Sequence, residues 1–154
     1  MFFLDTNVVS ELRKVSSGKA HPNVIAWNET VDPAETFIST VVLHELEIGV
    51  RSVERSDAMA GKVLRHWLKE VVIPAFSGRI LPLDEAAAIK AAEWHVPDPK
   101  PINDAYIAAT AFVRRLTLVS RNTKDFSGMG VPVINPWETS QARAAISGND
   151  PSDA

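Results

Sequence analysis

Short apolar runs alternate with longer segments of helical periodicity along most of the chain. The short runs predict five strands, near residues 2–5, 36–39, 79–83, 117–120 and 132–134. The longer segments predict helices near residues 7–14, 22–31, 41–53, 57–75, 84–96 and 102–116. Alternation of this kind is typical of βαβ units, so we expect an α/β fold with a mostly parallel sheet.

Proline and capping residues indicate where several of these helices begin or end. Pro22 suits a first helical turn, and Asp84 suits the N-cap of an alanine-rich helix. The segment from Val96 to Pro101 contains three prolines, which exclude a helix there. We therefore expect a loop before Asn103 and Asp104.

Length and composition suit one globular domain. With 154 residues, of which 45% are hydrophobic, the chain can bury roughly two thirds of the surface that its unfolded form exposes. We expect this domain over residues 1–138. Residues 139–154 offer few side chains to bury, so the sequence predicts a flexible tail there.

The chain has the composition of a cytoplasmic protein. No apolar run approaches the ~20 residues of a membrane span, and Asp5 interrupts the opening apolar stretch before it can serve as a signal peptide. The absence of cysteine excludes disulfides, thiolate metal sites and thiol catalysis. Any metal site must therefore use oxygen or imidazole ligands.

The formal net charge of −3 argues against a broad electrostatic surface for nucleic acid. Local basic groups do occur. Arg114 and Arg115 suit a helix C-terminus, where cations are favoured. Arg121 and Lys124 lie beside a predicted strand end, where a phosphate-facing role and simple solvation are both open.

The helical pair of residues 41–53 and 57–75 carries more apolar surface than a small sheet needs. Core packing accounts for most of it, including Leu64, Trp67 and Leu68. A surface for a partner protein would account for the excess.

Four acids lie at or just beyond the ends of predicted strands, namely Asp5, Glu45, Asp104 and Asp125. Each also has a local explanation. Asp5 and Asp104 suit first helical turns, where a carboxylate caps N–H groups and is favoured by the helix dipole. A salt bridge would satisfy Glu45 at the edge of a buried stripe, and turn chemistry would explain Asp125.

The four acids together favour a shared site, because the carboxyl ends of parallel strands meet at one edge of a sheet. Their mutual repulsion would cost stability, and a bound cation is the simplest compensation. An all-oxygen ligand set favours Mg²⁺ or Mn²⁺ over zinc. Since such a cation binds phosphate oxygens and stabilises developing charge, hydrolysis of phosphodiesters is the leading hypothesis.

Other catalytic signatures are absent. His44-Glu45 begins like a zinc-protease motif, but the second histidine would fall at Ile48. The sequence has no Walker A loop and no G-x-S-x-G elbow. A phosphatase of the haloacid dehalogenase type needs a second aspartate where Asn7 stands.

Four segments also match a known pattern in order and spacing: Leu4–Glu11, Ser39–Gly49, Asn103–Ala111 and Leu118–Phe126. Residues 73–82 and 135–137 add to the match. Through these residues the chain resembles, from Met1 to about Trp137, the PIN-domain ribonucleases of the VapC/FitB type, which are toxins of bacterial toxin–antitoxin modules.

The resemblance implies a PIN-like fold, with a five-stranded parallel sheet between helices on both faces, and an Mg²⁺- or Mn²⁺-dependent endoribonuclease. It makes Asp5 and Asp104 the principal metal ligands, with Glu45 and Asp125 as further catalytic acids. Polar supporting roles fall to Thr6, Ser120 and Asn122.

The resemblance also implies partners. It predicts a homodimer, an RNA substrate and inhibition by a small antitoxin of the VapB/FitA type. The antitoxin's C-terminal segment would lie across the helical pair of residues 41–75 and enter the acidic pocket. Operator DNA would be contacted only through the antitoxin.

Two positions depart from the family pattern. Ser120 stands where many members have threonine, which keeps the hydroxyl group. Some relatives carry their fourth acid at the position of Asn122, whereas the candidate here is Asp125, so the sequence leaves open which of the two faces the metal.

Two other functions stay open on the sequence. One is a regulatory binding module that acts mainly as the partner of a DNA-binding antitoxin, with weak or absent catalysis. The other is a metal-dependent DNA nuclease.

Overall fold

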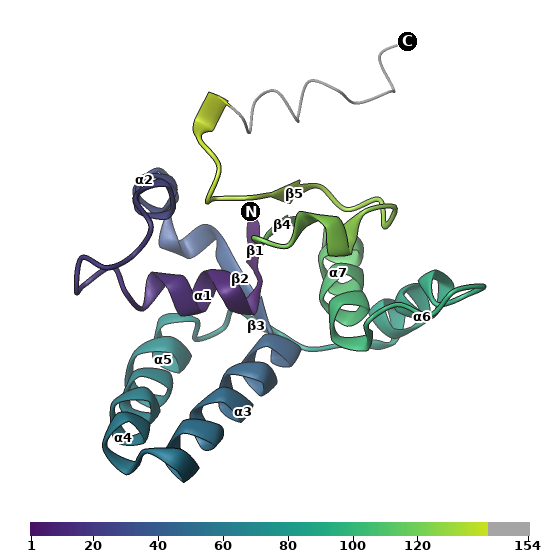
Figure 1. Cartoon of the computed structure of the whole chain (residues 1–154). Coiled ribbons are helices and arrows are strands. Elements are labelled where there is room, and N and C mark those ends of the chain that lie inside the picture. The colour runs from purple at the N-terminus through teal and green to yellow at the C-terminus, as the bar shows by residue number, and fades with distance from the viewer. Residues whose placement is uncertain (142–154) are drawn as a thin grey trace.

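The computed structural model describes residues 1–141 and contains a five-stranded sheet in the order β3-β2-β1-β4-β5 (Figure 1). The strands are β1 (Phe2–Leu4), β2 (Thr36–Ser39), β3 (Ile80–Leu81), β4 (Thr117–Val119) and β5 (Val133–Ile134). Each neighbouring pair is parallel. The predicted α/β fold with a five-stranded parallel sheet is confirmed, and each strand lies within or close to its expected range.

The helices alternate with the strands as the periodicity predicts. They are α1 (Thr6–Leu12), α2 (Pro22–Glu29), α3 (Thr40–Ser56), α4 (Ala58–His66), α5 (Ile73–Ala75), α6 (Glu85–Trp94) and α7 (Ile102–Arg114). Two 3₁₀ turns, η1 (Pro33–Glu35) and η3 (Thr123–Phe126), complete the connections. Figure 1 shows α1 and α2 on one side of the strands, α6 and α7 on the other, and the α3–α4 pair projecting away from the sheet.

The prediction of one regular helix over residues 57–75 is wrong in detail. After α4 the chain forms a π-helical segment, η2 (Trp67–Val72), before the short α5. Leu68 and Val72 are both buried, as they would be in a regular helix. The apolar spacing therefore cannot distinguish the wider turn from an α-helix.

The predicted helix boundaries have the expected chemistry. Asp84 caps α6 by accepting a hydrogen bond from Ala87 N at 2.9 Å, and Pro22 occupies the first turn of α2. The segment from Val96 to Pro101 is the loop between α6 and α7.

The central strands lie in the main core. Phe3, Ile38 and Leu118 of β1, β2 and β4 are completely buried, together with Val42 of α3 and Ile107 of α7. Burial of these side chains supplies most of the driving force for folding. A second cluster, formed by Ala87, Ala91, Ala105 and Ala109, packs α6 against α7.

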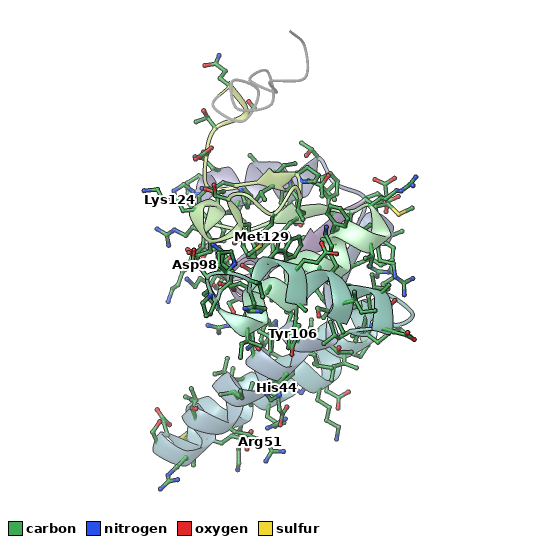
Figure 2. All side chains as sticks on the ribbon, turned by 90° about the vertical axis from the view of Figure 1, so that its right-hand side faces the viewer. His44, Arg51, Asp98, Tyr106, Lys124 and Met129 are labelled. Carbon is green, nitrogen blue, oxygen red and sulfur yellow. The ribbon has the colours of Figure 1, made fainter. Side chains whose placement is uncertain are left out.

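The α3–α4 pair is fastened by ion pairs. Arg65 of α4 lies between two acids of α3, at 2.7 Å from Glu47 and 2.5 Å from Glu54. Figure 2 shows Arg51 on the projecting part of this pair and His44 nearer to the body of the molecule.

No helix within residues 1–141 is long and apolar enough to span a membrane. Most of the predicted flexible tail, residues 139–154, lies outside the described residues, so that expectation is untested.

We predict that Gly61→Ala destabilises the protein by about 1–3 kcal/mol. Gly61 is buried at the α3–α4 contact, and a Cβ atom there would lie 2.5 Å from Glu54 Cα. This overlap involves the backbone, so it outweighs the helix propensity that alanine adds. Chemical denaturation of both proteins measures the difference.

Gly49→Ala is the matched control, because Gly49 is exposed within α3 and nothing lies within 4 Å of a Cβ atom built there. It should stabilise by up to about 1 kcal/mol. Equal effects of the two substitutions would contradict the close packing at Gly61.

Candidate active site

Asp5 lies at the end of β1, where the strand passes into α1, and only 6% of it is exposed. Its backbone N–H continues the sheet by donating to Val119 O of β4 at 2.9 Å. Its Oδ1 accepts a hydrogen bond from Thr6 N at 2.8 Å and so caps α1. The capping explanation is therefore correct, but it uses one carboxylate oxygen and leaves Oδ2 for other contacts.

The second oxygen of Asp5 is held by residues that follow β4. Ser120, which is completely buried, donates from Oγ to Asp5 Oδ2 at 2.7 Å. Ser120 Oγ accepts from Asn122 N at 3.0 Å, and Asn7 Nδ2 lies 3.3 Å from the same oxygen. These contacts fix the Asp5 carboxylate between the ends of two neighbouring strands.

Glu45 approaches Asp5 from α3, which begins directly after β2. Thr6 Oγ1 donates to Glu45 Oε1 at 2.8 Å. Glu45 is half-buried beside the buried Leu46, so it lies at the edge of the apolar stripe as expected. Thr6 therefore links the two carboxylates, since its backbone N–H donates to Asp5 and its hydroxyl donates to Glu45.

Asp104 lies in the first turn of α7 and is half-buried. The next turns of α7 place Ala108 and Ala111 in the main core, as the alanine pattern predicts. The start of α7 therefore brings Asp104 close enough to Asp5, Asp125 and Glu45 for their charges to act on it.

Asn122 and Asp125 are the two candidates for the fourth position, and both are exposed. Asn122 supports Ser120 through its backbone N–H. Asp125 lies in η3, and its charge acts on both Asp5 and Asp104. Which of the two faces a metal stays a prediction.

Burial and like charge disfavour ionisation of Asp5 and Asp104. Burial raises the pKa of Asp5; the Ser120 and Thr6 hydrogen bonds oppose the rise, and the charges of Glu45 and Asp125 add to it. Burial, with the charges of Asp5, Asp125 and Glu45, raises the pKa of Asp104 to about 6. The acids are therefore held together at an electrostatic cost.

Carboxylate oxygens, the donors at this site, are the ligands that Mg²⁺ and Mn²⁺ prefer. Within residues 1–141 no group of three or more histidine, aspartate or glutamate side chains is assembled to hold a metal ion. Mg²⁺ does not need such a cage, because one or two carboxylates, water and substrate phosphates commonly bind it. Asp5 and Asp104, whose charges repel one another, are the candidate protein ligands.

Two residues take part in this region through contacts that the sequence does not predict. Asn7 Oδ1 accepts from Arg121 N at 3.2 Å, and Asn7 Nδ2 lies 3.4 Å from Asp5 Oδ2. The guanidinium of Arg121 lies over the Trp137 ring, with Cζ 5.4 Å from the ring centroid. The only available signals were the spacing of Asn7 from Asp5 and the position of Arg121 beside a strand end.

We predict that Asp104→Asn raises the Tm at pH 7.5 in EDTA. An acid whose pKa is higher in the folded than in the unfolded state makes the protein less stable as pH rises between those values, here from about 4 to about 6. The amide avoids this loss. Thermal unfolding at several pH values should show a gain at pH 7.5 that shrinks towards pH 4.

Asp84→Asn serves as the control, because Asp84 caps α6 and faces Arg114 at 3.4 Å instead of other acids. We expect no gain from it. An Asp104→Asn gain that is absent, or that grows towards pH 4, would show that repulsion does not act on Asp104.

Comparison with known proteins connects this geometry to a family. The model of the PIN domain matches residues 2–131. Toxin FitB of Neisseria gonorrhoeae is 36% identical over 143 residues, covering 89% of this chain and 99% of the relative. VapC ribonuclease Y4jK of Sinorhizobium fredii is 34% identical over 146 residues, covering 90% and 99%.

A solved structure supports the same assignment. The structure of FitAB bound to an IR36 DNA fragment contains a chain that aligns with a TM-score of 0.76 at 30% identity, covering 91% of this chain and 98% of that one. Sequence, fold and the order of the acids agree. The chain belongs to the PIN-domain family, and within it to the VapC/FitB type of toxin.

Proposed function

We propose that this protein is a cytoplasmic Mg²⁺- or Mn²⁺-dependent endoribonuclease and the toxin of a VapBC/FitAB-like toxin–antitoxin system. The observation that carries the proposal is the placement of three carboxylates at one sheet edge, where Thr6 and Ser120 hold Asp5, Thr6 holds Glu45, and Asp104 lies in the first turn of α7. Relatives named ribonuclease support the choice of reaction.

In this proposal Asp5 and Asp104 hold the cation. Once bound, the cation supplies positive charge for a phosphate oxygen of RNA and for the charge that develops during hydrolysis. Ser120 and the Thr6 N–H fix the two oxygens of Asp5, so the carboxylate needs no rearrangement. This preorganisation offsets part of the cost of burying Asp5.

Glu45 is the candidate general base. Thr6 holds Glu45 Oε1, which leaves Oε2 to accept the proton of the attacking water. Asp125 adds negative charge that favours cation binding. Attack by water with departure of the 3′ oxygen gives products with 5′-phosphate and 3′-hydroxyl ends.

The same proposal includes a homodimer and a small antitoxin of the VapB/FitA type, through which operator DNA is contacted. The α3–α4 pair exposes apolar side chains, with Ile48 51%, Met59 81% and Val63 65% exposed. Such a surface suits a protein partner. The structural relatives that are toxin–antitoxin complexes with DNA support this partner class.

We predict that the purified full chain cleaves single-stranded RNA with Mg²⁺ and that EDTA abolishes the cleavage. Asp5→Asn and Asp104→Asn should each lower the rate by on the order of 10²–10⁴. Asparagine is as good an N-cap as aspartate, so Asp5→Asn should keep α1 intact. Gel assays of a labelled oligonucleotide measure the rate.

Asp84→Asn is the matched control for this assay, because Asp84 is also an N-cap aspartate but lies in α6. Its activity should equal that of the unmodified chain. Full activity of the folded Asp5→Asn and Asp104→Asn proteins would contradict the proposal.

A regulatory module with little catalysis is the alternative, favoured by the net charge of −3 and the exposed apolar residues of the α3–α4 pair. Co-purification with a small partner fits either function. We therefore predict RNA cleavage after denaturing removal of the partner and refolding; a refolded chain without activity would support the regulatory module.

A DNA nuclease is distinguished from a ribonuclease by offering RNA and DNA to the protein at equal concentration.

A further inference from the structure

The backbone of Arg121 adjoins the acidic site. It directly follows Ser120, whose hydroxyl holds Asp5 Oδ2. Its own N–H donates to Asn7 Oδ1 at 3.2 Å, and Asn7 Nδ2 lies 3.3 Å from Ser120 Oγ. The backbone of Arg121 is therefore fixed by the same contacts that fix Asp5.

The Arg121 side chain is exposed and lies over the Trp137 ring, 5.4 Å from Cζ to the ring centroid. Within the described part of the chain its guanidinium forms no ion pair, in contrast to Arg65, which binds two acids. A guanidinium stacked on an aromatic ring keeps its in-plane N–H donors available. Those donors match the geometry of a phosphate group.

Hydrogen bonds to its N–H and its C=O fix the backbone of Trp137. Trp137 N donates to Asn135 Oδ1 at 2.9 Å, and Asn23 Nδ2 of α2 donates to Trp137 O at 2.7 Å. Pro136 between them is completely buried. Ser120 N also donates to Ile134 O at 3.0 Å, which keeps the Arg121 and Trp137 segments side by side.

We propose that the Arg121–Trp137 pair binds a backbone phosphate of the RNA strand next to the phosphate that is cleaved. This rests on the proposed ribonuclease function. The acids at this site would repel a polyanion, and the chain as a whole has a formal net charge of −3. A fixed cation one residue from Ser120 offsets this repulsion where the strand enters, without reading the base sequence.

The test is binding of a labelled single-stranded RNA oligonucleotide to the full-length Asp104→Asn protein, by fluorescence anisotropy over a range of salt concentrations. In this background Arg121→Gln should raise the Kd about 10-fold. It should also flatten the dependence of log Kd on log salt by about 0.7, the value for one phosphate contact to a single strand.

Two further variants separate a phosphate contact from simple charge. Arg121→Lys keeps the charge but loses the planar donors, so it should recover only part of the affinity. Trp137→Leu should weaken binding about 2- to 5-fold, whereas Trp137→Phe should weaken it less. Circular dichroism checks that each variant is folded; if Trp137→Leu does not fold, the Arg121 variants still decide.

Arg51→Gln is the matched control, because it removes the same charge from the projecting part of α3 (Figure 2). Arg51 pairs there with Glu47 of the same helix. Its Kd and salt dependence should be unchanged. The inference fails if Arg121→Gln leaves both unchanged, if Arg51→Gln weakens binding equally, or if the parent protein binds no RNA.

The active protein adds a second readout, in which Arg121→Gln raises KM more than it lowers kcat. A parent chain that binds RNA without cleaving it would overturn the proposed function and leave this inference standing. Cleavage of RNA by the parent chain, with a KM that Arg121→Gln leaves unchanged, would support the proposed function and overturn this inference.

Discussion

The parallel pairing of β1 with both β2 and β4 is the constraint on which the site depends. It places the end of β1, at Asp5, between the ends of two neighbours. The helix after β2 then brings in Glu45, and the residue after β4 supplies the Ser120 hydroxyl. Burial of apolar side chains in these strands therefore holds together polar groups that would otherwise separate.

Hydrogen bonds hold the Asp5 carboxylate, while the neighbouring carboxylates repel one another. Asp5 has hydrogen bonds to both oxygens, yet its pKa is still raised, because burial outweighs them. Burial, together with the charges of its acidic neighbours, also raises the pKa of Asp104. A divalent cation would offset this repulsion. Under the proposed function, the arrangement that destabilises the metal-free protein would therefore serve catalysis.

The sequence predicts those parts of the structure that follow from local chemistry or periodicity. Strand ends and the inward position of Asp104 are of this kind, since apolar runs and an alanine stripe specify them. The apolar pattern of the sequence does not reveal the π-helical segment after α4, because Leu68 and Val72 keep a helical spacing. The Arg121–Trp137 contact also escapes prediction, because it depends on the alignment of β4 with β5 and on the turn that follows.

The most direct test of the proposed metal site is an NMR titration of the Asp104 carboxyl carbon in EDTA and in Mg²⁺. In EDTA we expect an apparent pKa of about 6, and added Mg²⁺ should lower it, because the cation favours the charged form. A pKa near 3.8 in EDTA, or one that Mg²⁺ leaves unchanged, would contradict a shared acidic metal site.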